Sequence, residues 1–328
     1  QNLSEKNRTL NRLIAPPRGQ IFDHKGYALA FNDNIYRCVL SPNLENDDLS
    51  SADKVAKILK LDEDALQELK KQLSYKTKIA AVAKEDLSWE EMSELQVHAN
   101  EIPELIIEKS QMRCYIDAPV FCHAIGYAAK ANLDDIEKYD LPKIPGLKVG
   151  KAGLEKTQEK RLEGSPGVQK LEINAKRRII RILSQSSPKP GNDINLTINA
   201  HLQKKTASLL REHRSAAAIV MEAQTGKVRA YVSHPGYDTN DFVSGISKKK
   251  WQELLENPDH PLTDKIITGQ YSPGSTFKMI IALAALKDGV DPNSTVFCNG
   301  HYDLGNHRFH CWTWKTGGHG TVNMEQAI

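Results

Sequence analysis

The first forty residues alternate between apolar and polar side chains over two stretches, which predicts extended structure. Residues 20–30 fit a strand, a turn at Lys25-Gly26 and a second strand, and residues 34–40 fit a further strand. Ahead of them, Glu5 to Leu13 has the composition of a short polar helix, which Pro16-Pro17 cannot continue. The chain is therefore expected to open with a helical stub followed by a β-rich region.

From Ser51 to Leu73 the repeat of the pattern lengthens to three or four residues, which is typical of an amphipathic helix. The apolar positions are Val55, Ile58, Leu59, Leu66, Leu69 and Leu73. Residues 79–82 and 105–107 are short apolar runs that predict strands. Between them, Ser88 followed by Glu91 is typical of a helix N-terminus with a capping box. Together these elements predict a small α/β lobe.

Farther along, a charged helix is expected between Gly150 and Gly164, and strands are expected between Val168 and Ile182. Residues 184–191 concentrate serine, proline and glycine and form the best linker candidate. We therefore place a boundary there, between an N-terminal domain at 1–187 and a second domain at 188–328. The pattern then predicts a strand, a helix and a hairpin, at 194–198, 200–214 and 216–233. That order fits the start of an antiparallel sheet covered by helices, so the predicted fold class is α+β.

Composition limits the classes of function. The 328 residues carry 44 basic and 41 acidic side chains, a net charge of +3, which gives no concentrated basic surface for nucleic acid. A hydrophobic share of 40% fits a soluble globular protein. The most apolar run, Met279 to Leu286, is far shorter than the ~20 residues that cross a bilayer. Because the chain begins at Gln1 without an initiator methionine, we expect a membrane anchor upstream of it.

The segment from Gln270 to Lys278 carries the strongest chemical signal. Pro273-Gly274 interrupts whatever precedes it, and the apolar run after it predicts a buried helix with Ser275 in its first turn. The helix dipole and free backbone N–H groups there favour negative charge on the serine oxygen. Lys278 follows three residues later on the same face, and its pKa is expected to fall because an apolar helix disfavours its charge. The pair predicts a nucleophile and its proton acceptor, without histidine.

A Ser-x-x-Lys sequence alone also fits a helix N-cap followed by a surface lysine, but the Pro-Gly entry, the apolar helix and Phe277 favour catalysis. Residues 271–278 resemble the first motif of the penicillin-binding proteins. Residues 17–26 look like the Arg-Gly-x-Ile-x-Asp-Arg-x-Gly segment of the class B monofunctional transpeptidases. Residues 153–164 are similar to their second pedestal motif, and residues 218–228 to the hairpin that opens their catalytic domain.

The resemblance implies a fold and a reaction. It implies a β-rich N-terminal pedestal of the dimerisation type with a small α/β lobe, followed by the start of a transpeptidase domain. Ser275 would attack the penultimate D-Ala carbonyl of a peptidoglycan stem peptide, and an amine of a neighbouring stem would resolve the acyl-enzyme. β-Lactams would acylate the same serine. A periplasmic location at the inner membrane is implied too, beside the glycosyltransferase RodA and the scaffold MreC of the elongation machinery.

Two motifs of that family are not found where they are expected. No Ser-x-Asn follows Ser275. Lys315-Thr316-Gly317 matches the Lys-Thr-Gly motif only by its letters, because it lies 40 residues past Ser275 in a glycine-rich loop. Residues 324–328 read as the start of a helix. We therefore expect this chain alone to lack half of the oxyanion hole and to be unable to cross-link peptidoglycan.

Soft and imidazole ligands crowd into 22 residues, and they suggest zinc. They are Cys298, His301, Asp303, His307, His310, Cys311 and His319. Elongation-type members of the resembled family have a metal loop after the Ser-x-x-Lys helix. Matching Trp312 and Gly318-His319-Gly320 to that loop makes Cys298, Cys311 and His319 the ligands of a structural zinc, with a fourth beyond Ile328. A Cys298–Cys311 disulfide and ordinary loop histidines stay open as alternatives.

Two other classes of function each fit part of the sequence. A β-lactam-recognising hydrolase or sensor would share the serine helix but not the large N-terminal domain. A docking scaffold would use that domain, with the serine incidental. The remaining cysteines fit buried free thiols. Without catalytic or metal spacing, other residues fit turns or packing: Asp23, Glu155, Asp193, His201, His213 and His234.

Overall fold

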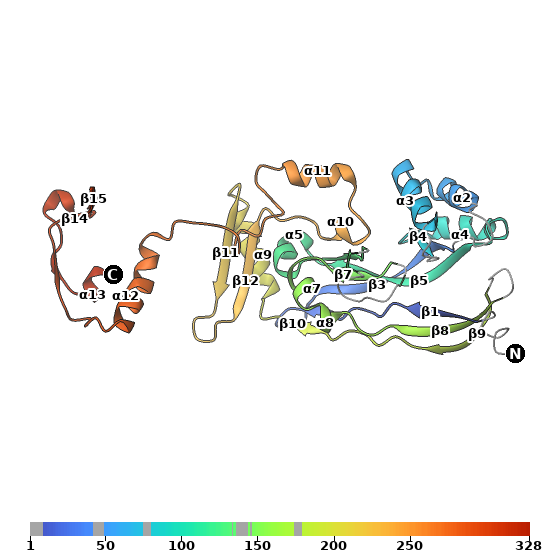
Figure 1. Ribbon diagram of the computed structural model, residues 1–328, viewed down its shortest axis with the longest axis horizontal. Helices are drawn as coiled ribbons and strands as arrows, with labels where there is room; N and C mark the ends of the chain where they lie inside the picture. The colour runs from blue at the N-terminus through green and yellow to red at the C-terminus, as the bar shows by residue number, and fades with distance from the viewer. Residues whose placement is uncertain are drawn as a thin grey trace. The chain divides into compact units, whose positions relative to one another are not determined.

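The computed structural model describes residues 9–41, 49–74, 80–132, 134–135, 144, 146–173 and 179–328 (Figure 1). Contacts between Cα atoms divide the chain into two compact units, Gln1–Thr268 and Gly269–Ile328. Across the described ranges, no helix is both long and apolar enough to span a bilayer.

Two sheets organise the first unit. Their strands are β1 (Thr9–Ile14), β2 (Ile21–Phe22), β3 (Ala28–Leu40), β4 (Ala81–Lys84), β5 (Leu105–Tyr115), β8 (Gly167–Ile173), β9 (Ile179–Ser186) and β10 (Ile194–Asn195). The larger sheet has the order β10-β2-β3-β4, and β5 also pairs with β3, from Ala30 opposite Tyr115 to Leu40 opposite Leu105. The smaller sheet has the order β1-β8-β9 and is antiparallel throughout.

The helical stub expected between Glu5 and Leu13 is wrong from Thr9 onward, and the rest of it lies outside the described residues. Thr9 to Ile14 forms β1, which pairs with β8 from Glu172 to Gly167. Hydrogen bonds to a strand far away in the sequence outweigh the weak helix preference of a short polar segment.

The strand-turn-strand prediction for residues 20–30 is confirmed. Gly26 takes the bend between β2 and β3 with a φ of 83°, a conformation that glycine adopts without steric cost. The separate strand predicted at 34–40 is the second part of β3, which runs without interruption to Leu40.

The predicted α/β lobe is confirmed and consists of α2 (Ser50–Leu59), α3 (Glu63–Ser74), β4 and α4 (Trp89–Val97). Lys60 adopts a left-handed conformation and separates the first two helices. The capping box at α4 is present, since the Ser88 side chain accepts from the Glu91 N–H and the Glu91 carboxylate accepts from the Ser88 N–H. The lobe packs around its own core, which includes Val55, Leu69 and Leu95.

The remainder of the first unit joins the sheets to a hairpin and several helices. The elements are α5 (Ala118–Ile125), β6 (Ala128–Lys130), β7 (Lys148–Gly150), α7 (Gly153–Thr157), α8 (Glu159–Leu162), α9 (Ala200–Leu210), β11 (Ala216–Met221), β12 (Val228–His234), α10 (Asn240–Val243) and α11 (Lys248–Glu256). The hairpin of β11 and β12 is confirmed. The fully buried Gln203 of α9 donates to the carbonyls of Val120 and Tyr231, at 2.9 and 2.6 Å. It thereby ties α9 to α5 and to β12.

A buried ionic network holds the loop after β1 against α7. Glu155, which is 0% exposed, accepts from Arg18 Nη2 and Arg113 Nε, both at 2.7 Å, and from the Tyr115 hydroxyl at 3.1 Å. Arg18 also donates to Glu159 at 2.8 Å. Burial alone would raise the pKa of Glu155, but the charges of the two arginines and their hydrogen bonds outweigh it and lower that pKa. Glu155 is thus the centre of a structural cluster, a role that its position in a helix did not reveal.

The segment expected to be a linker, residues 184–191, makes regular contacts within the first unit. β9 continues to Ser186, and Ser165 and Lys189 exchange two backbone hydrogen bonds of 2.9 Å. Gly191 N–H donates to the Pro17 carbonyl at 2.9 Å. The boundary at 187/188 stays a prediction.

The second unit consists of short elements. They are the 3-10 turn η2 (Gly274–Phe277), α12 (Lys278–Lys287), β13 (Val296–Cys298), β14 (His301–Leu304), β15 (His307–His310), the 3-10 turn η3 (Trp314–Thr316), β16 (Gly320–Val322) and α13 (Met324–Ala327). β13 pairs with β16, and β14 with β15. The helix start expected at 324–328 is α13. Together the two units confirm the α+β class.

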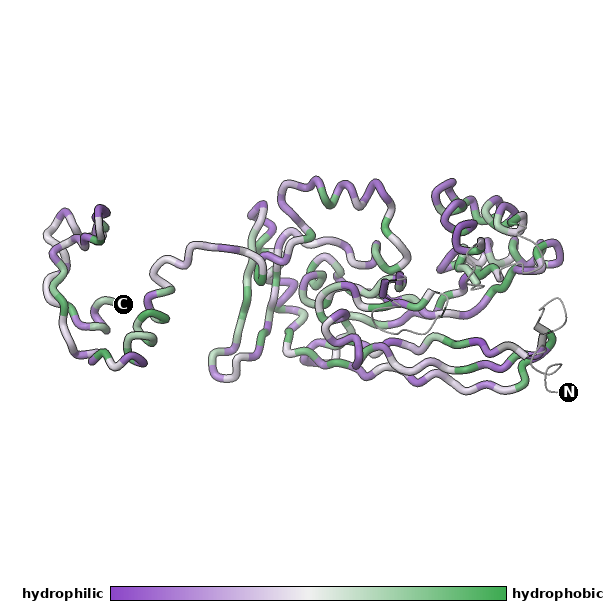
Figure 2. Tube along the Cα trace, in the orientation of Figure 1, coloured by the Kyte–Doolittle hydropathy of each residue, from purple (hydrophilic) through white to green (hydrophobic). Residues whose placement is uncertain are grey.

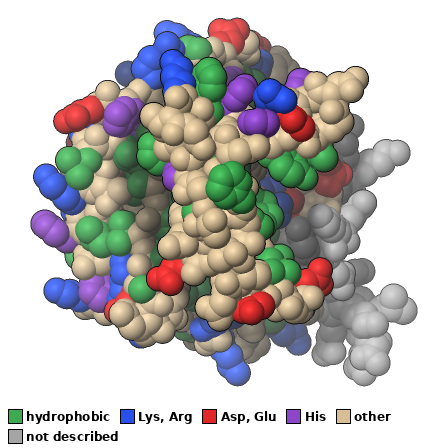
Figure 3. Space-filling view, turned by 90° about the vertical axis from the view of Figure 1, so that its left-hand side faces the viewer, with side chains coloured by type: hydrophobic (Ala, Val, Ile, Leu, Met, Phe, Trp, Pro, Cys, Tyr) green, Lys and Arg blue, Asp and Glu red, His purple; other side chains and the backbone are tan. Residues whose placement is uncertain are grey.

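The expected burial of α12 is wrong for the part of the chain that the structure describes. Ile280 and Ile281 are each 56% exposed and Leu283 is 66% exposed. A helix that is apolar on every side needs packing partners all round, and the short elements of this unit leave most of its surface uncovered. Figure 2 shows hydrophobic residues along α12, and hydrophobic side chains lie open on the face shown in Figure 3.

Candidate functional site

Ser275 and Lys278 lie where the chain enters α12. Ser275 is in the 3-10 turn η2, which begins at Gly274, and Lys278 is the first residue of α12. Ser275 was expected in the first turn of the helix. It lies instead in the 3-10 turn directly before α12. Gly274 has a φ of 53°, which explains a glycine directly before the serine.

Both side chains are exposed, and the structure brings them to neighbouring positions without joining them. Lys278 Nζ donates to the Ala327 carbonyl of α13 at 3.4 Å, near the limit of a hydrogen bond. The Thr276 hydroxyl donates to the Pro273 carbonyl at 2.5 Å. Among the described residues, the Ser275 hydroxyl has no hydrogen-bond partner. It is therefore free to reach a molecule from solvent.

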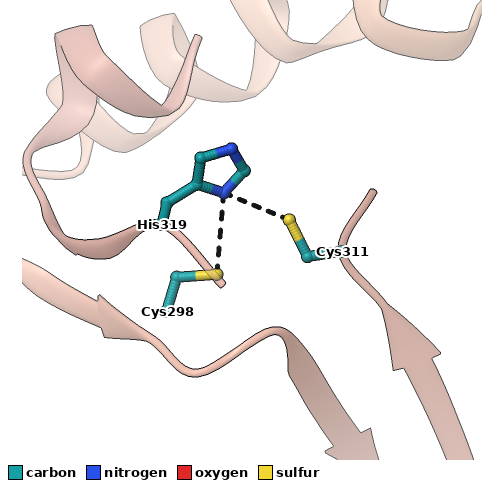
Figure 4. A group of neighbouring side chains, drawn as sticks. All are labelled: Cys298, Cys311 and His319. Carbon is teal, nitrogen blue, oxygen red and sulfur yellow. Dashed lines mark hydrogen bonds between the residues drawn. The ribbon is translucent and has the colours of Figure 1, made fainter. Parts of the chain in front are cut away.

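Three of the predicted metal ligands converge. Cys298 ends β13, Cys311 follows β15 and His319 precedes β16. His319 Nδ1 lies 3.2 Å from Cys311 Sγ and 3.9 Å from Cys298 Sγ (Figure 4). The three ligand atoms all lie within 4.8 Å of one another. The same imidazole nitrogen faces both sulfurs, as one ion bound among them would require.

Backbone pairing positions these ligands. Cys298 is opposite Gly320 in the β13–β16 ladder, which places the residue before Gly320 beside the thiol. Cys311 N–H donates to the Gly300 carbonyl at 2.8 Å. A Cβ on Gly318 would lie 2.3 Å from the Cys298 carbonyl oxygen and from Gly300 N, so only glycine allows this approach.

The surroundings favour the thiolate form of both cysteines. Backbone hydrogen bonds from His319 and Gly300 lower the pKa of Cys298. Hydrogen bonds from the side chain and then the backbone of Thr313 lower the pKa of Cys311. Metals bind the deprotonated thiolate. All five cysteines are free thiols, and two thiolates with one imidazole suit zinc.

The other candidate ligands do not join this group. Asp303 pairs with Arg308 at 2.7 Å across the β14–β15 hairpin, and the His310 ring contacts Trp314. In the part of the chain that the structure describes, Cys298, Cys311 and His319 are the only such group. Elsewhere Cys38 and Cys122 are buried and Cys114 is half-buried. Lys315-Thr316-Gly317 spans the turn η3 and its end, so it is not on a strand.

The chain matches two family models, one after the other. The Penicillin-binding Protein dimerisation domain matches residues 13–196, and the Penicillin binding protein transpeptidase domain matches residues 216–328. Peptidoglycan D,D-transpeptidase MrdA of Escherichia coli is 32% identical over all of this chain and 53% of its own length. MrdA of Acinetobacter baumannii is also 32% identical, over 99% of this chain and 49% of the relative.

Among solved structures, the complex of PBP2 with MreC from Helicobacter pylori superposes with a TM-score of 0.80. It is 27% identical and covers 98% of this chain and 60% of the solved one. The chain therefore belongs to the class B penicillin-binding proteins, in the penicillin-binding protein 2 group. The resemblance of its motifs is confirmed. The chain spans about half the length of the curated relatives it matches.

Proposed function

We propose that the protein carrying this chain is a peptidoglycan D,D-transpeptidase that uses Ser275 as its nucleophile and Lys278 as its proton acceptor. The observation that supports this most is the exposed Ser275 side chain at the entry to α12, within the segment that matches a transpeptidase domain. The relatives that cover the whole chain are named D,D-transpeptidases.

The reaction divides into two acyl transfers. Ser275 Oγ attacks the penultimate D-Ala carbonyl of a stem peptide as Lys278 Nζ takes the hydroxyl proton. The C–N bond to the terminal D-Ala breaks, and the leaving amine takes that proton. An amine of a neighbouring stem then attacks the Ser275 ester, forms the cross-link and returns the proton to the serine. β-Lactams form the same ester by opening their ring.

The local structure suits these steps. The long contact between Lys278 Nζ and the Ala327 carbonyl is weak, so the lysine can turn to Ser275 at little cost. The N-terminal end of α12 favours negative charge developing on the attacked carbonyl oxygen. We propose that the remaining donors and the binding site for the substrate carboxylate come from sequence outside this chain, and that this chain alone does not cross-link.

Location and partners follow from the family. We propose that the chain acts in the periplasm, held at the inner membrane by an anchor upstream of Gln1. We further propose that the first unit is a pedestal for the elongation machinery, with MreC and RodA as partners. A solved PBP2 in complex with MreC matches nearly the whole chain, which supports the first of these partners.

We also propose a structural zinc at Cys298, Cys311 and His319. A bound zinc would cross-link the ends of β13, β15 and β16, and it takes no part in the acyl transfers. Elemental analysis of the full-length protein should find one zinc, and Cys298→Ser should remove it. His307→Ala is the matched control, since His307 begins β15, the strand directly before Cys311, and lies outside the group. A full-length protein without zinc, unaffected by a chelator, would refute this assignment.

Intact mass after exposure to benzylpenicillin tests the enzyme assignment on the chain extended through the rest of a transpeptidase domain. We expect one stable adduct, its loss in Ser275→Ala, and its retention in Ser272→Ala, a neighbouring exposed serine. An adduct that hydrolyses rapidly would favour a β-lactam hydrolase. A folded protein that forms no adduct would leave a docking scaffold as the better assignment.

A further inference from the structure

A single threonine lies between two of the converging metal ligands. Thr313 Oγ1 is 3.4 Å from Cys311 Sγ and 3.2 Å from His319 Nδ1. The two cysteine side chains also share a hydrogen bond, and the backbone N–H groups of Gly300 and His319 donate to Cys298 and that of Thr313 to Cys311. In the described part of the chain, Thr313 therefore supplies the one side-chain hydroxyl at this group.

The backbone holds Thr313 firmly in this position. Its carbonyl accepts from Gly318 N–H at 3.1 Å and from both the N–H and the hydroxyl of Thr316, each at 3.0 Å. These bonds close the turn η3 and fix the distance between Thr313 and Gly318-His319. The hydroxyl is thus carried by the same turn that carries the imidazole ligand.

A bound metal ion would leave the Thr313 hydroxyl with one hydrogen-bond acceptor. Without an ion, Thr313 Oγ1 has two acceptors within reach, the imidazole Nδ1 and the Cys311 sulfur. An ion bound among the three ligands would take the Nδ1 lone pair, because that nitrogen faces both sulfurs. The thiolate sulfur would keep lone pairs free and become the remaining acceptor.

We propose that Thr313 is the positioning residue of this metal site: its hydroxyl donates a hydrogen bond to the Cys311 thiolate and orients it for the ion. This inference rests on the proposed zinc site. Hydrogen bonds to ligands from the surrounding residues fix ligand orientation, and their loss typically weakens metal affinity by about 10–100-fold.

The test measures zinc affinity of the full-length protein by competition with a chelator of known affinity. Thr313→Val removes the hydroxyl and keeps the shape, and Thr313→Ser keeps the hydroxyl. Thr321→Val is the matched control, because Thr321 lies on β16, exposed and outside the group. Cobalt(II) in place of zinc gives a second readout, the thiolate-to-metal charge-transfer band, which responds to hydrogen bonding at the sulfur.

We expect Thr313→Val to bind zinc about 10–100-fold more weakly and to shift the cobalt band. Thr313→Ser and Thr321→Val should match the parent. Thr313→Ala removes the hydroxyl without adding bulk and should follow Thr313→Val, which guards against a valine that disturbs the turn. Parent-like affinity and an unshifted band in both hydroxyl-free variants would overturn the proposal and leave the zinc site standing. Equal weakening in Thr313→Ser would overturn it too, whereas a parent that binds neither metal refutes the zinc site itself.

Discussion

Two groups of polar side chains in this chain have opposite surroundings. Around Glu155, charges are buried and each partner belongs to the first unit: Arg18, Arg113, Tyr115 and Glu159. In the second unit, Ser275 and Lys278 are exposed, and the serine hydroxyl has no partner among the described residues. Most hydrogen-bonding atoms of the first group are paired within the fold, with Arg113 Nη2 as an exception among the described residues, whereas the Ser275 hydroxyl is exposed and available.

The difference separates structural from chemical use of polar residues. A buried carboxylate between two arginines is stable only because every charge is compensated, so it has nothing left with which to bind a substrate. A nucleophile must instead be reachable and incompletely satisfied. Substitutions in the Glu155 group should therefore lower folding stability, whereas substitutions at Ser275 and Lys278 should lower the rate of acylation.

The largest loss of folding stability is expected from Glu155→Gln. The variant keeps the shape of the side chain but leaves Arg18 and Arg113 buried without their shared counter-charge, which typically costs about 3–5 kcal/mol. Urea denaturation of the full-length protein measures it. Asp64→Asn is the control: it breaks the exposed ion pair with Lys248 and should leave stability unchanged. Equal stability of the two variants would show that the buried Glu155 group stabilises the fold no more than an exposed ion pair does.

Lys278→Met should instead lower the rate of acylation and leave folding stability unchanged. Removing the proposed proton acceptor is expected to slow acylation by a β-lactam by about 10²–10⁴-fold, the usual contribution of general base catalysis. The midpoint of urea denaturation should not move, because Lys278 is exposed and its hydrogen bond to the Ala327 carbonyl is long. Lys287→Met at the other end of α12 is the control and should acylate normally. A large loss of stability in Lys278→Met would show that this lysine is structural.

The two groups also differ in how far the sequence revealed them. Ser275 and Lys278 are close in the chain, and the Pro-Gly before them and the apolar run after them are local signals, so their positions were predictable. Cys298, Cys311 and His319 were chosen by resemblance, and the structure brings the three together. Whether zinc binds there stays a prediction. Thr313 had no signal at all, because a hydroxyl two residues after a cysteine is ordinary until a turn places it beside the sulfur.

Long-range pairing explains what could not be predicted. Glu155 meets Arg18 and Arg113 from positions 137 and 42 residues away, and no local pattern encodes such contacts. β1 is a strand because β8 pairs with it, not because of its own residues. By contrast the capping box at Ser88 and the turn at Gly26 depend on neighbouring residues, and both were predicted correctly.

A smaller effect is expected at two glycines that share a positive φ, although Gly126 has a ψ of −151°, outside the left-handed helical region. Gly126 has a φ of 74°, and a Cβ there would lie 1.9 Å from the Ala152 carbonyl oxygen. Gly226 has a φ of 71° and nothing within 4 Å. Alanine should cost about 1–2 kcal/mol at either position, because a Cβ disfavours a positive φ. Gly126→Ala should cost about 1–3 kcal/mol more, because of the close approach. Urea denaturation of both variants measures the difference, and equal losses would show that packing around Gly126 is loose.

The last prediction concerns how the stability contributed by Glu155 depends on pH. The pKa of Glu155 in the folded protein lies below its ordinary value, which is about 4.3 in an unfolded chain. Above that pH the carboxylate is charged in both states, and its full contribution to stability is present. As the pH falls below about 4.3, the unfolded chain takes up the proton first, so stability declines until the folded pKa is also passed.

Unfolding free energies of the parent and of Glu155→Gln should therefore converge as the pH falls from about 6 toward about 3. Because the other carboxyl groups titrate in both proteins, the difference between the two curves isolates Glu155. A difference that stays constant over this range would mean that the arginines do not lower the pKa of Glu155, and that its burial is balanced in some other way.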